Sequence, residues 1–247
     1  LQAMTNIMAT LPNKCGGTRT VAIAATIYRL LMELDNEEIA GYEKLNVFSG
    51  DSATAGASAL RAAEDRALEA ELESHEGQLT ITMLWDIKKF FDSIDIATLV
   101  AEAEATGFPL RQLALSLSVH LAPRRLKLGT AVGNPILQLG RSILAGCKRS
   151  THLARVYTVR AVKELDKEHP EVSIGQHVDD ISNLAKGRTE DELVGRAVKY
   201  GIHFSSLMKA LHMDISGKSV IVPLSAAAKR TVKILTGLGI PIKAEQA

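Results

Sequence analysis

The stretch GQHVDDISNL, residues 175–184, places two adjacent aspartates inside an otherwise mostly uncharged segment. Apolar residues lie on both sides of the pair, as in two short strands, where aspartate is disfavoured. On a flat strand successive side chains point to opposite faces, so one carboxylate would enter the core. A tight turn at Asp179 and Asp180 removes this conflict, and we therefore expect a hairpin there.

A second strand that ends in a carboxylate lies upstream, in QLTITMLWDI, residues 78–87. Its alternation puts four apolar residues, from Leu79 to Trp85, on one face and Asp86 on the other. Asp86 comes where a buried strand is about to leave the core. We expect its carboxylate and both hairpin carboxylates to face the same side.

Three carboxylates at one place repel each other, and their pKa values rise unless something compensates. Oxygen ligands of this kind suit Mg²⁺ or Mn²⁺. Two such ions, roughly 3.5–4 Å apart, are the usual device for in-line displacement at phosphorus. We therefore predict a site for two divalent ions at Asp86, Asp179 and Asp180. Two aspartates alone are more often turn formers or helix caps, so the hypothesis depends on their combination with Asp86.

The composition is that of a globular chain, with 247 residues, 46% hydrophobic and 23% charged, enough for one large domain or two closely packed ones. A formal net charge of +1 does not by itself indicate nucleic-acid binding, although it leaves room for a local basic groove. Cys15 and Cys147 make no disulfide framework and favour a reducing compartment. The sequence shows neither a transmembrane run nor a signal peptide.

The predicted elements alternate between helix and strand, which indicates an α+β fold with a small antiparallel sheet covered by helices. In the helix over 58–74 we expect Leu60, Leu68 and Leu72 to lie along one apolar side. Thr189 and Glu192 fit a capping box. The other expected elements are strands over 16–24 and 218–224, helices over 25–34, from about 96 and over 147–165, and a loop over 48–58.

Five segments, in order, resemble the reverse transcriptase domain of retroelements, of the kind found in non-LTR retrotransposons and group II introns. LPNKCGGTRTVAIAATIYRLLM resembles the fingers segment, and LWDIKKFFDSI closely resembles the first catalytic palm motif. LAGCKRSTHLARVY resembles the second palm motif, HVDDI the catalytic YxDD hairpin, and LMKALHMDISGKSVIV the motif that follows. The resemblance covers most of the chain.

This resemblance implies an RNA-directed DNA polymerase that uses two Mg²⁺ or Mn²⁺ ions to add deoxynucleotides to a primer 3′-hydroxyl. The expected fold is a right-hand polymerase palm over 79–247 with partial fingers over 1–78. No thumb is expected, and the chain is expected to be a fragment of a longer polyprotein. The implied partners are an RNA template, a DNA primer and deoxynucleoside triphosphates, with no membrane. Many non-LTR elements work in the nucleus, but the sequence does not give a location.

The resemblance also assigns residues. Asp86, Asp179 and Asp180 match the catalytic, metal-binding carboxylates, and the backbone carbonyl of Ile87 is a further metal ligand by position. Phe91 matches the aromatic steric gate against a 2′-hydroxyl. The implied nucleotide-binding set is Arg19, Ile87, Phe91, Gly146, Ser150 and Lys218, with Lys14 as a further phosphate contact, and Lys148 and Arg149 would contact nucleic-acid phosphates.

Ordinary structural explanations compete with these roles. One of the adjacent Phe90 and Phe91 is expected to pack in the core, Lys14 and Lys218 can be surface charges, and the basic run 124–127 is expected to be a solvated face. His177 stands where the family has Tyr or Phe, and Ala145 where it has Gln. The alternatives are therefore a catalytically lapsed, nucleic-acid-binding copy, or a metal-dependent phosphohydrolase, which would lack the usual histidine-rich metal set.

Overall fold

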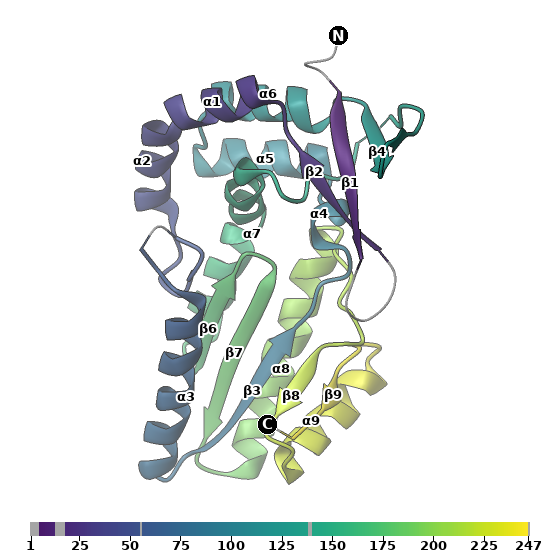
Figure 1. Ribbon diagram of the computed structural model, residues 1–247. Helices are drawn as coiled ribbons and strands as arrows, with labels where there is room; N and C mark the ends of the chain where they lie inside the picture. The colour runs from purple at the N-terminus through teal and green to yellow at the C-terminus, as the bar shows by residue number, and fades with distance from the viewer. Residues whose placement is uncertain (1–4, 13–17, 55, 138–139, 247) are drawn as a thin grey trace. The chain divides into compact units, whose positions relative to one another are not determined.

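The structure is a computed structural model that describes residues 5–12, 18–54, 56–137 and 140–246, with the backbone alone at 12, 18 and 19. The chain forms two compact units, each discontinuous in sequence (Figure 1). Unit 1 contains Leu1–Asn46 and Phe91–Tyr157, and unit 2 contains Val47–Phe90 and Thr158–Ala247. The predicted division at residue 78 concerns polymerase subdomains and stays a prediction.

Unit 1 contains a mixed sheet that the sequence did not predict, in the order β2-β1-β4-β5, with β1 parallel to β4. Its strands are β1 (Asn6–Pro12), β2 (Thr18–Ile23), β4 (Arg124–Leu128) and β5 (Ala131–Val132), and its helices are α1 (Thr26–Leu34), α2 (Asn36–Asn46), α5 (Ile96–Thr106) and α6 (Leu110–His120). The predicted strand over 16–24 and the helix over 25–34 are confirmed as β2 and α1. The expectation that the basic run 124–127 is a solvated face is wrong at Arg124, which is buried and donates a hydrogen bond to Ser142 Oγ (2.9 Å).

Unit 2 contains the sheet that carries the predicted hairpin, in the order β6-β7-β3-β8-β9. Its strands are β3 (Leu79–Trp85), β6 (Val172–His177), β7 (Asp180–Gly187), β8 (Val220–Val222) and β9 (Lys243–Ala244), and its helices are α3 (Ala59–His75), α8 (Glu190–Ala210) and α9 (Ala226–Gly237). All neighbouring strands are antiparallel except β8 and β9. Helix α8 packs behind β7 and β3 (Figure 1). Two further helices, α4 (Phe90–Ser93) and α7 (Lys148–Glu168), contribute residues to both units.

The buried face of this sheet fixes how β3 and β7 align. Trp85 stacks on Phe204 of α8, with ring centroids 4.6 Å apart. Its indole Nε1 donates to Asn183 Oδ1 at 2.7 Å, and both side chains are buried. The ladder pairs Trp85 with Ile181 and Met83 with Asn183, so this hydrogen bond runs diagonally between neighbouring pairs. A slip of one residue would break the bond and turn every β3 side chain to the opposite face.

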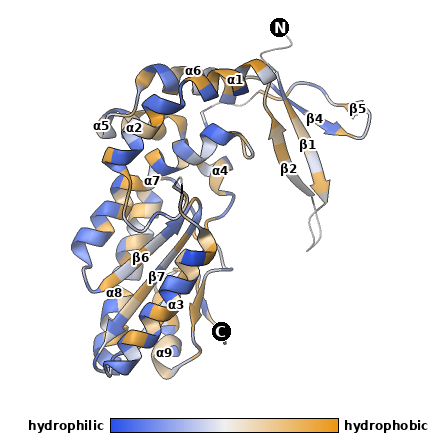
Figure 2. Cartoon of the chain, turned by 60° about the vertical axis from the view of Figure 1, so that its left-hand side comes forward, coloured by the Kyte–Doolittle hydropathy of each residue, from blue (hydrophilic) through white to orange (hydrophobic). Residues whose placement is uncertain are grey.

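Helix α3 lies over the other face of the sheet without burying any residue. The expectation that its leucines form a packed apolar side is wrong, because Leu60, Leu68 and Leu72 are 70%, 54% and 55% exposed. Polar contacts hold the helix instead, among them an ion pair between Glu73 and Lys186 of β7 (2.5 Å). Figure 2 shows α3 in front of the sheet, with hydrophobic residues in orange and hydrophilic residues in blue. In the described part of the chain, no helix is long and apolar enough to cross a membrane.

Unit 1 buries a histidine at its centre. His120, fully buried at the end of α6, accepts a hydrogen bond at Nδ1 from the Leu144 N–H (3.3 Å). Burial, and then the charges of Arg124 and Arg149, lower the pKa of His120 to about 3. An unperturbed histidine has a pKa of about 6.5. The folded chain therefore keeps this imidazole neutral at pH values where the unfolded chain protonates it.

We expect the free energy of unfolding to fall as the pH is lowered from about 6.5 to about 5. Across this window the extra proton bound by residue 120 in the unfolded chain rises from about half a proton to nearly one, so the slope rises to about 1.4 kcal/mol of stability per pH unit. Urea unfolding followed by circular dichroism at several pH values measures the slope. His120→Gln should remove this part of the slope, whereas His75→Gln, at an exposed histidine, should keep it. Equal slopes in wild type and His120→Gln would contradict the assignment.

Candidate functional site

The ladder of unit 2 brings Asp86 and Asp180 to neighbouring positions on one face of the sheet. Antiparallel β3 and β7 end with Trp85 opposite Ile181. Asp86 follows Trp85 and Asp180 precedes Ile181, so the two aspartates occupy the next opposed position. Because Trp85 and Ile181 are buried against the helices, alternation places both aspartates on the open face. Asp86 is half-buried and Asp180 is exposed.

The predicted hairpin is confirmed, with β6 and β7 joined by the two residues Val178 and Asp179. The last pair before the turn is His177 with Asp180. Val178 has a φ of 58°, in the left-handed region that a β-branched residue rarely adopts and that such turns usually give to Gly or Asn. The tip of the hairpin is therefore strained, and the paired strands on both sides hold it in place.

The backbone of Asp86 is fixed by the turn between α8 and β8. The Ser216 N–H donates to the Asp86 carbonyl at 2.7 Å, and the Asp86 N–H donates to Ser219 Oγ at 3.1 Å. Ile87, buried, forms the next bridge with Ile215. Lys218 lies in the same turn, exposed, two residues before β8. The predicted lysine before a strand is thus found beside Asp86, although Ser216 and Ser219 were not identified from the sequence.

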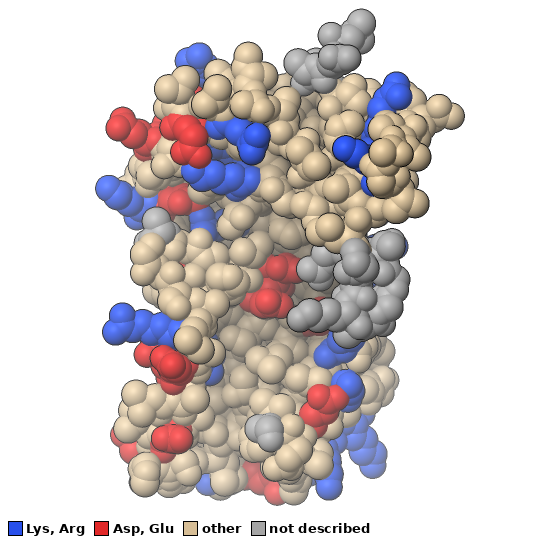
Figure 3. All heavy atoms as spheres, in the orientation of Figure 1, with Lys and Arg blue, Asp and Glu red and all other residues tan. Residues whose placement is uncertain are grey.

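A groove of about 980 Å³ runs between α3 and the open face of the sheet. Asp86, Asp180, Lys218 and His177 line it, together with Arg66 of α3. Figure 3 shows acidic side chains, in red, in a hollowed part of the molecule's surface. Carboxylates, a lysine and a histidine therefore border one open cavity within unit 2.

The carboxylates do not form a preassembled group of three. Within the described ranges, no set of three or more His, Cys, Asp or Glu side chains is placed to hold a metal ion. Asp86 and Asp180 line the groove, whereas Asp179 occupies the turn beside it. Mg²⁺ usually takes one or two carboxylates and completes its shell with substrate phosphates and water. The pair Asp86 and Asp180 fits that pattern.

His177 is held by a loop that the sequence predicted without predicting its partner. Its Nδ1 lies 3.1 Å from Ser52 Oγ. The Ser52 N–H donates to the Gln176 carbonyl (2.8 Å), and the Gln176 N–H donates to the Gly50 carbonyl (2.9 Å), so the loop pairs alongside β6. A Cβ on Gly50 would collide with the Ile174 carbonyl. The loop therefore positions the residue that departs from the YxDD pattern.

Phe91 and Arg19 belong to unit 1. Phe90 is 3% exposed and Phe91 is half-buried, which confirms that one of the two aromatic rings packs in the core. The Phe91 carbonyl accepts from the Ile143 N–H (2.9 Å). Arg19 lies on β2 with its backbone opposite Leu11, and its side chain is outside the described residues, as is all of Lys14.

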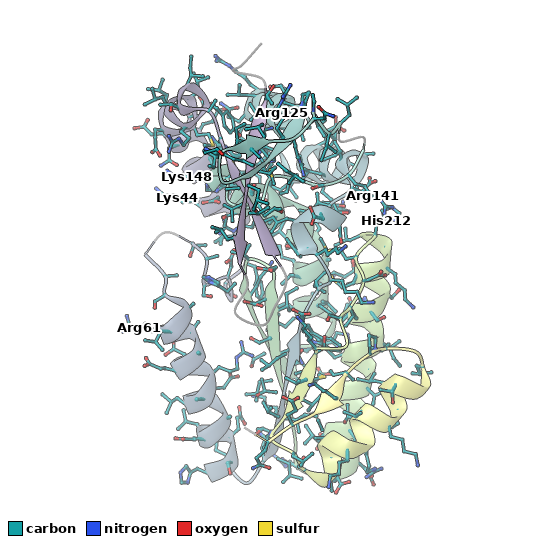
Figure 4. The ribbon with its side chains drawn as sticks, turned by 45° about the vertical axis from the view of Figure 1, so that its right-hand side comes forward. Lys44, Arg61, Arg125, Arg141, Lys148 and His212 are labelled. Atoms are coloured by element: carbon teal, nitrogen blue, oxygen red, sulfur yellow. The ribbon has the colours of Figure 1, made fainter. Side chains whose placement is uncertain are left out.

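Several residues of the segment 144–157, which resembles the second palm motif, have structural roles within unit 1. Gly146 has a φ of 91°, and a Cβ there would lie 2.6 Å from Val21 Cγ1, so β2 makes the close approach. Buried Ser150 donates to the Leu144 carbonyl. Lys148, labelled in Figure 4, is exposed and pairs with Glu33 (2.8 Å). Arg149 is only 2% exposed, so its guanidinium does not reach a phosphate in this structure.

No model of a known protein family matches the chain, and no curated protein matches it in sequence. Solved telomerase structures do match. Telomerase of Candida tropicalis truncated from its C-terminal domain aligns with a TM-score of 0.62 and 11% identity over 91% of this chain and 51% of that one. The same telomerase with a TWJ fragment of telomeric RNA gives 0.63 and 11%, over 91% and 42%. Candida albicans telomerase with such a fragment gives 0.60 and 10%, over 90% and 42%.

The chain has a telomerase-like fold. It spans about half the length of these telomerases or less. At this identity the likeness concerns the fold, which is mixed α/β with a sheet in each unit. The narrower resemblance to retroelement reverse transcriptases stays a hypothesis.

We expect Ser219→Ala to lower the free energy of unfolding by about 1–3 kcal/mol. The substitution removes the hydroxyl of the fully buried Ser219 and so leaves the Asp86 N–H without its acceptor. Urea titration followed by circular dichroism measures the change. Ser118→Ala, at an exposed hydroxyl that bonds only within its own helix, is the matched control and should stay within about 0.5 kcal/mol. Equal small effects of the two substitutions would show that Ser219 does not brace Asp86.

Proposed function

We propose that the chain is the palm and partial fingers of an RNA-directed DNA polymerase, which joins deoxynucleotides to a primer 3′-hydroxyl. One observation carries this proposal. Asp86 and Asp180 occupy neighbouring positions on one sheet face, beside a two-residue hairpin and an open groove. The telomerase-like fold supports it, since telomerases are reverse transcriptase-like polymerases. A solved telomerase is in complex with a TWJ fragment of telomeric RNA, which supports a nucleic-acid partner.

In this proposal Asp86 and the hairpin carboxylates, with the Ile87 carbonyl, hold Mg²⁺ or Mn²⁺. When bound, two such ions make the primer hydroxyl a better nucleophile and stabilise the leaving pyrophosphate. The protein holds the Asp86 backbone in place, because its carbonyl accepts a hydrogen bond from the Ser216 N–H and its N–H donates one to Ser219 Oγ. Exposed Lys218 lines the same groove and is the candidate contact for the triphosphate of the incoming nucleotide.

The nucleotide-binding roles proposed for residues of unit 1 have unequal support. Phe91 keeps its role as steric gate, since it is the ring of the adjacent pair that stays accessible. Arg19 keeps its role from the resemblance alone. Gly146 and Ser150 are needed for packing in unit 1, so a nucleotide contact by either would be an additional role. The DNA primer, the deoxynucleotides and further domains of a polyprotein belong to the proposal.

A second candidate is a nucleic-acid-binding domain of the same fold that no longer polymerises. The lack of a preassembled three-carboxylate group among the described residues favours it. His177 and Ala145, which replace the family's aromatic and glutamine, point the same way. The two candidates differ in whether a bound primer is extended.

Asp86→Asn should abolish extension of an oligo-dT primer on a poly-A template with Mg²⁺ or Mn²⁺. We expect a loss of about a thousand-fold, because metal-assisted charge stabilisation supplies several kcal/mol and each 1.4 kcal/mol is tenfold in rate. Gel analysis of primer extension measures the rate. Asp214→Asn removes an exposed carboxylate of the same unit outside the groove and should leave the rate unchanged.

Extension that survives Asp86→Asn would exclude the proposed carboxylate role. Primer binding without extension by the wild type, in either metal, would favour the second candidate. Binding is measured on the same primer and template by fluorescence anisotropy.

Phe91→Ala should let the polymerase accept ribonucleotides, because the ring that excludes the 2′-hydroxyl is removed. Loss of a steric contact of this size is worth about 1–3 kcal/mol, so the preference for deoxynucleotides should fall roughly 10- to 200-fold. Single-nucleotide incorporation with dTTP and UTP measures kcat/KM for each substrate. Unchanged discrimination would assign Phe91 to packing alone.

A further inference from the structure

Arg66 of α3 lines the groove and reaches across to β6. Its Nη1 donates to the Ser173 carbonyl of β6 at 2.7 Å. A Cβ added to Gly175 would lie 2.5 Å from Arg66 Nη2 and 3.0 Å from Ser182 Oγ. Gly175 therefore provides the space that brings the guanidinium against the strands. Arg61, five residues earlier on α3, also lines the groove, but its side chain is exposed and extends away from the helix (Figure 4).

Arg66 forms no ion pair among the described residues, although the negative charge of the nearby Glu69 partly offsets the effect of burial on its pKa. The neighbouring Glu69 hydrogen-bonds to the Ser173 hydroxyl and makes no ion pair with Arg66. Burial lowers the pKa of Arg66, although a guanidinium stays protonated in proteins. A half-buried cation with one carbonyl acceptor is costly, and it keeps donors suited to the paired oxygens of a phosphate.

The groove around Arg66 suits a strand more than a compact ligand. Its lining includes small side chains from both walls, Ala62 and Ala70 of α3 and Thr82, Ser182 and Val220 of the sheet. Asp86 and Asp180 line the same cavity of about 980 Å³. A strand that brings its 3′ end to these carboxylates would pass Arg66.

The strand register gives the distance along the groove. Gly175 pairs with Ser182, two residues along the ladder from the pair His177 and Asp180. At about 3.3 Å per residue, Arg66 lies roughly 6.6 Å from the level of Asp180. A stacked nucleic-acid strand rises about 3.4 Å per nucleotide. The separation corresponds to about two nucleotides.

We propose that Arg66 is a positioning residue that binds the primer-strand phosphate about two nucleotides from the 3′ end. This inference rests on the proposed polymerase function and adds to it a contact from α3, outside all five motif-like segments. Lys218 and Arg66 would then hold two different phosphate-bearing partners, the incoming nucleotide and the primer.

The test is a position scan on the whole 247-residue chain. DNA primers carry a 5′ fluorescein and one uncharged methylphosphonate at a single linkage, moved through the four linkages nearest the 3′ end. Anisotropy measures Kd for wild type, Arg66→Ala, Arg66→Lys and Arg61→Ala. For the unmodified primer, we expect Arg66→Ala to raise Kd about tenfold and to lower the slope of log K against log salt by about 0.7.

Coupling to one linkage identifies the contact. In wild type, a methylphosphonate at the second linkage should weaken binding about tenfold, and in Arg66→Ala it should weaken binding no further. Arg66→Lys should keep the salt slope, because the charge remains. Arg61→Ala should show no coupling to any linkage. If Arg66→Ala fails to fold, Arg66→Lys decides, because an ammonium cannot reproduce the paired contact of a guanidinium and should weaken the dependence on the second linkage.

Wild-type binding that is indifferent to linkage position would overturn the proposal, as would an Arg66→Ala response equal to that of wild type at every linkage. Primer extension separates this outcome from failure of the polymerase function. Extension without linkage coupling overturns the role of Arg66 alone. Coupling without extension supports the phosphate contact and counts against polymerisation.

Discussion

The hydrogen bond from Trp85 to Asn183 fixes the alignment on which the groove depends. It ties β3 to β7 in one register, and that register alone sets Asp86 beside Asp180 on the open face. The buried amide of Asn183 also lowers the stability of the fold, since its Nδ2 has no hydrogen-bond partner among the described residues. A leucine there would pack without an unsatisfied amide but would not specify the register. The polar pair is best understood as a determinant of strand alignment.

Much of the local structure follows from local patterns. Alternation predicted β3, the run of alanine and leucine predicted α3, and Thr189 caps α8 by accepting from the Glu192 N–H (3.2 Å). Strands β1 and β4 were missed because they find each other across more than a hundred residues, Asn6 opposite Arg124. The leucine side of α3 was misjudged for another reason. Periodicity shows which residues share a face, but not whether anything covers that face.

The candidate site was predicted unevenly for the same reason. Adjacent carboxylates between apolar runs indicated a hairpin, and strand alternation placed Asp86 toward it. Ser219 could not be found from the sequence, since a serine gives no local signal that it braces a residue 133 positions away. The resemblance to reverse transcriptases predicted which positions could contact a ligand, but not whether their side chains are buried. Arg149 matches a basic position of the motif-like segment, yet it lies inside unit 1.

The strained tip of the hairpin has a consequence for how rigid the turn is. A β-branched residue with positive φ costs roughly 1–3 kcal/mol and persists only where its surroundings over-determine it. Here the ladders of β6 and β7 and the attached loop supply that constraint. The backbone of the turn at Val178 and Asp179 is therefore set before any ligand arrives. In the proposed polymerase, a turn fixed in advance would not have to reorganise when a ligand binds beside it.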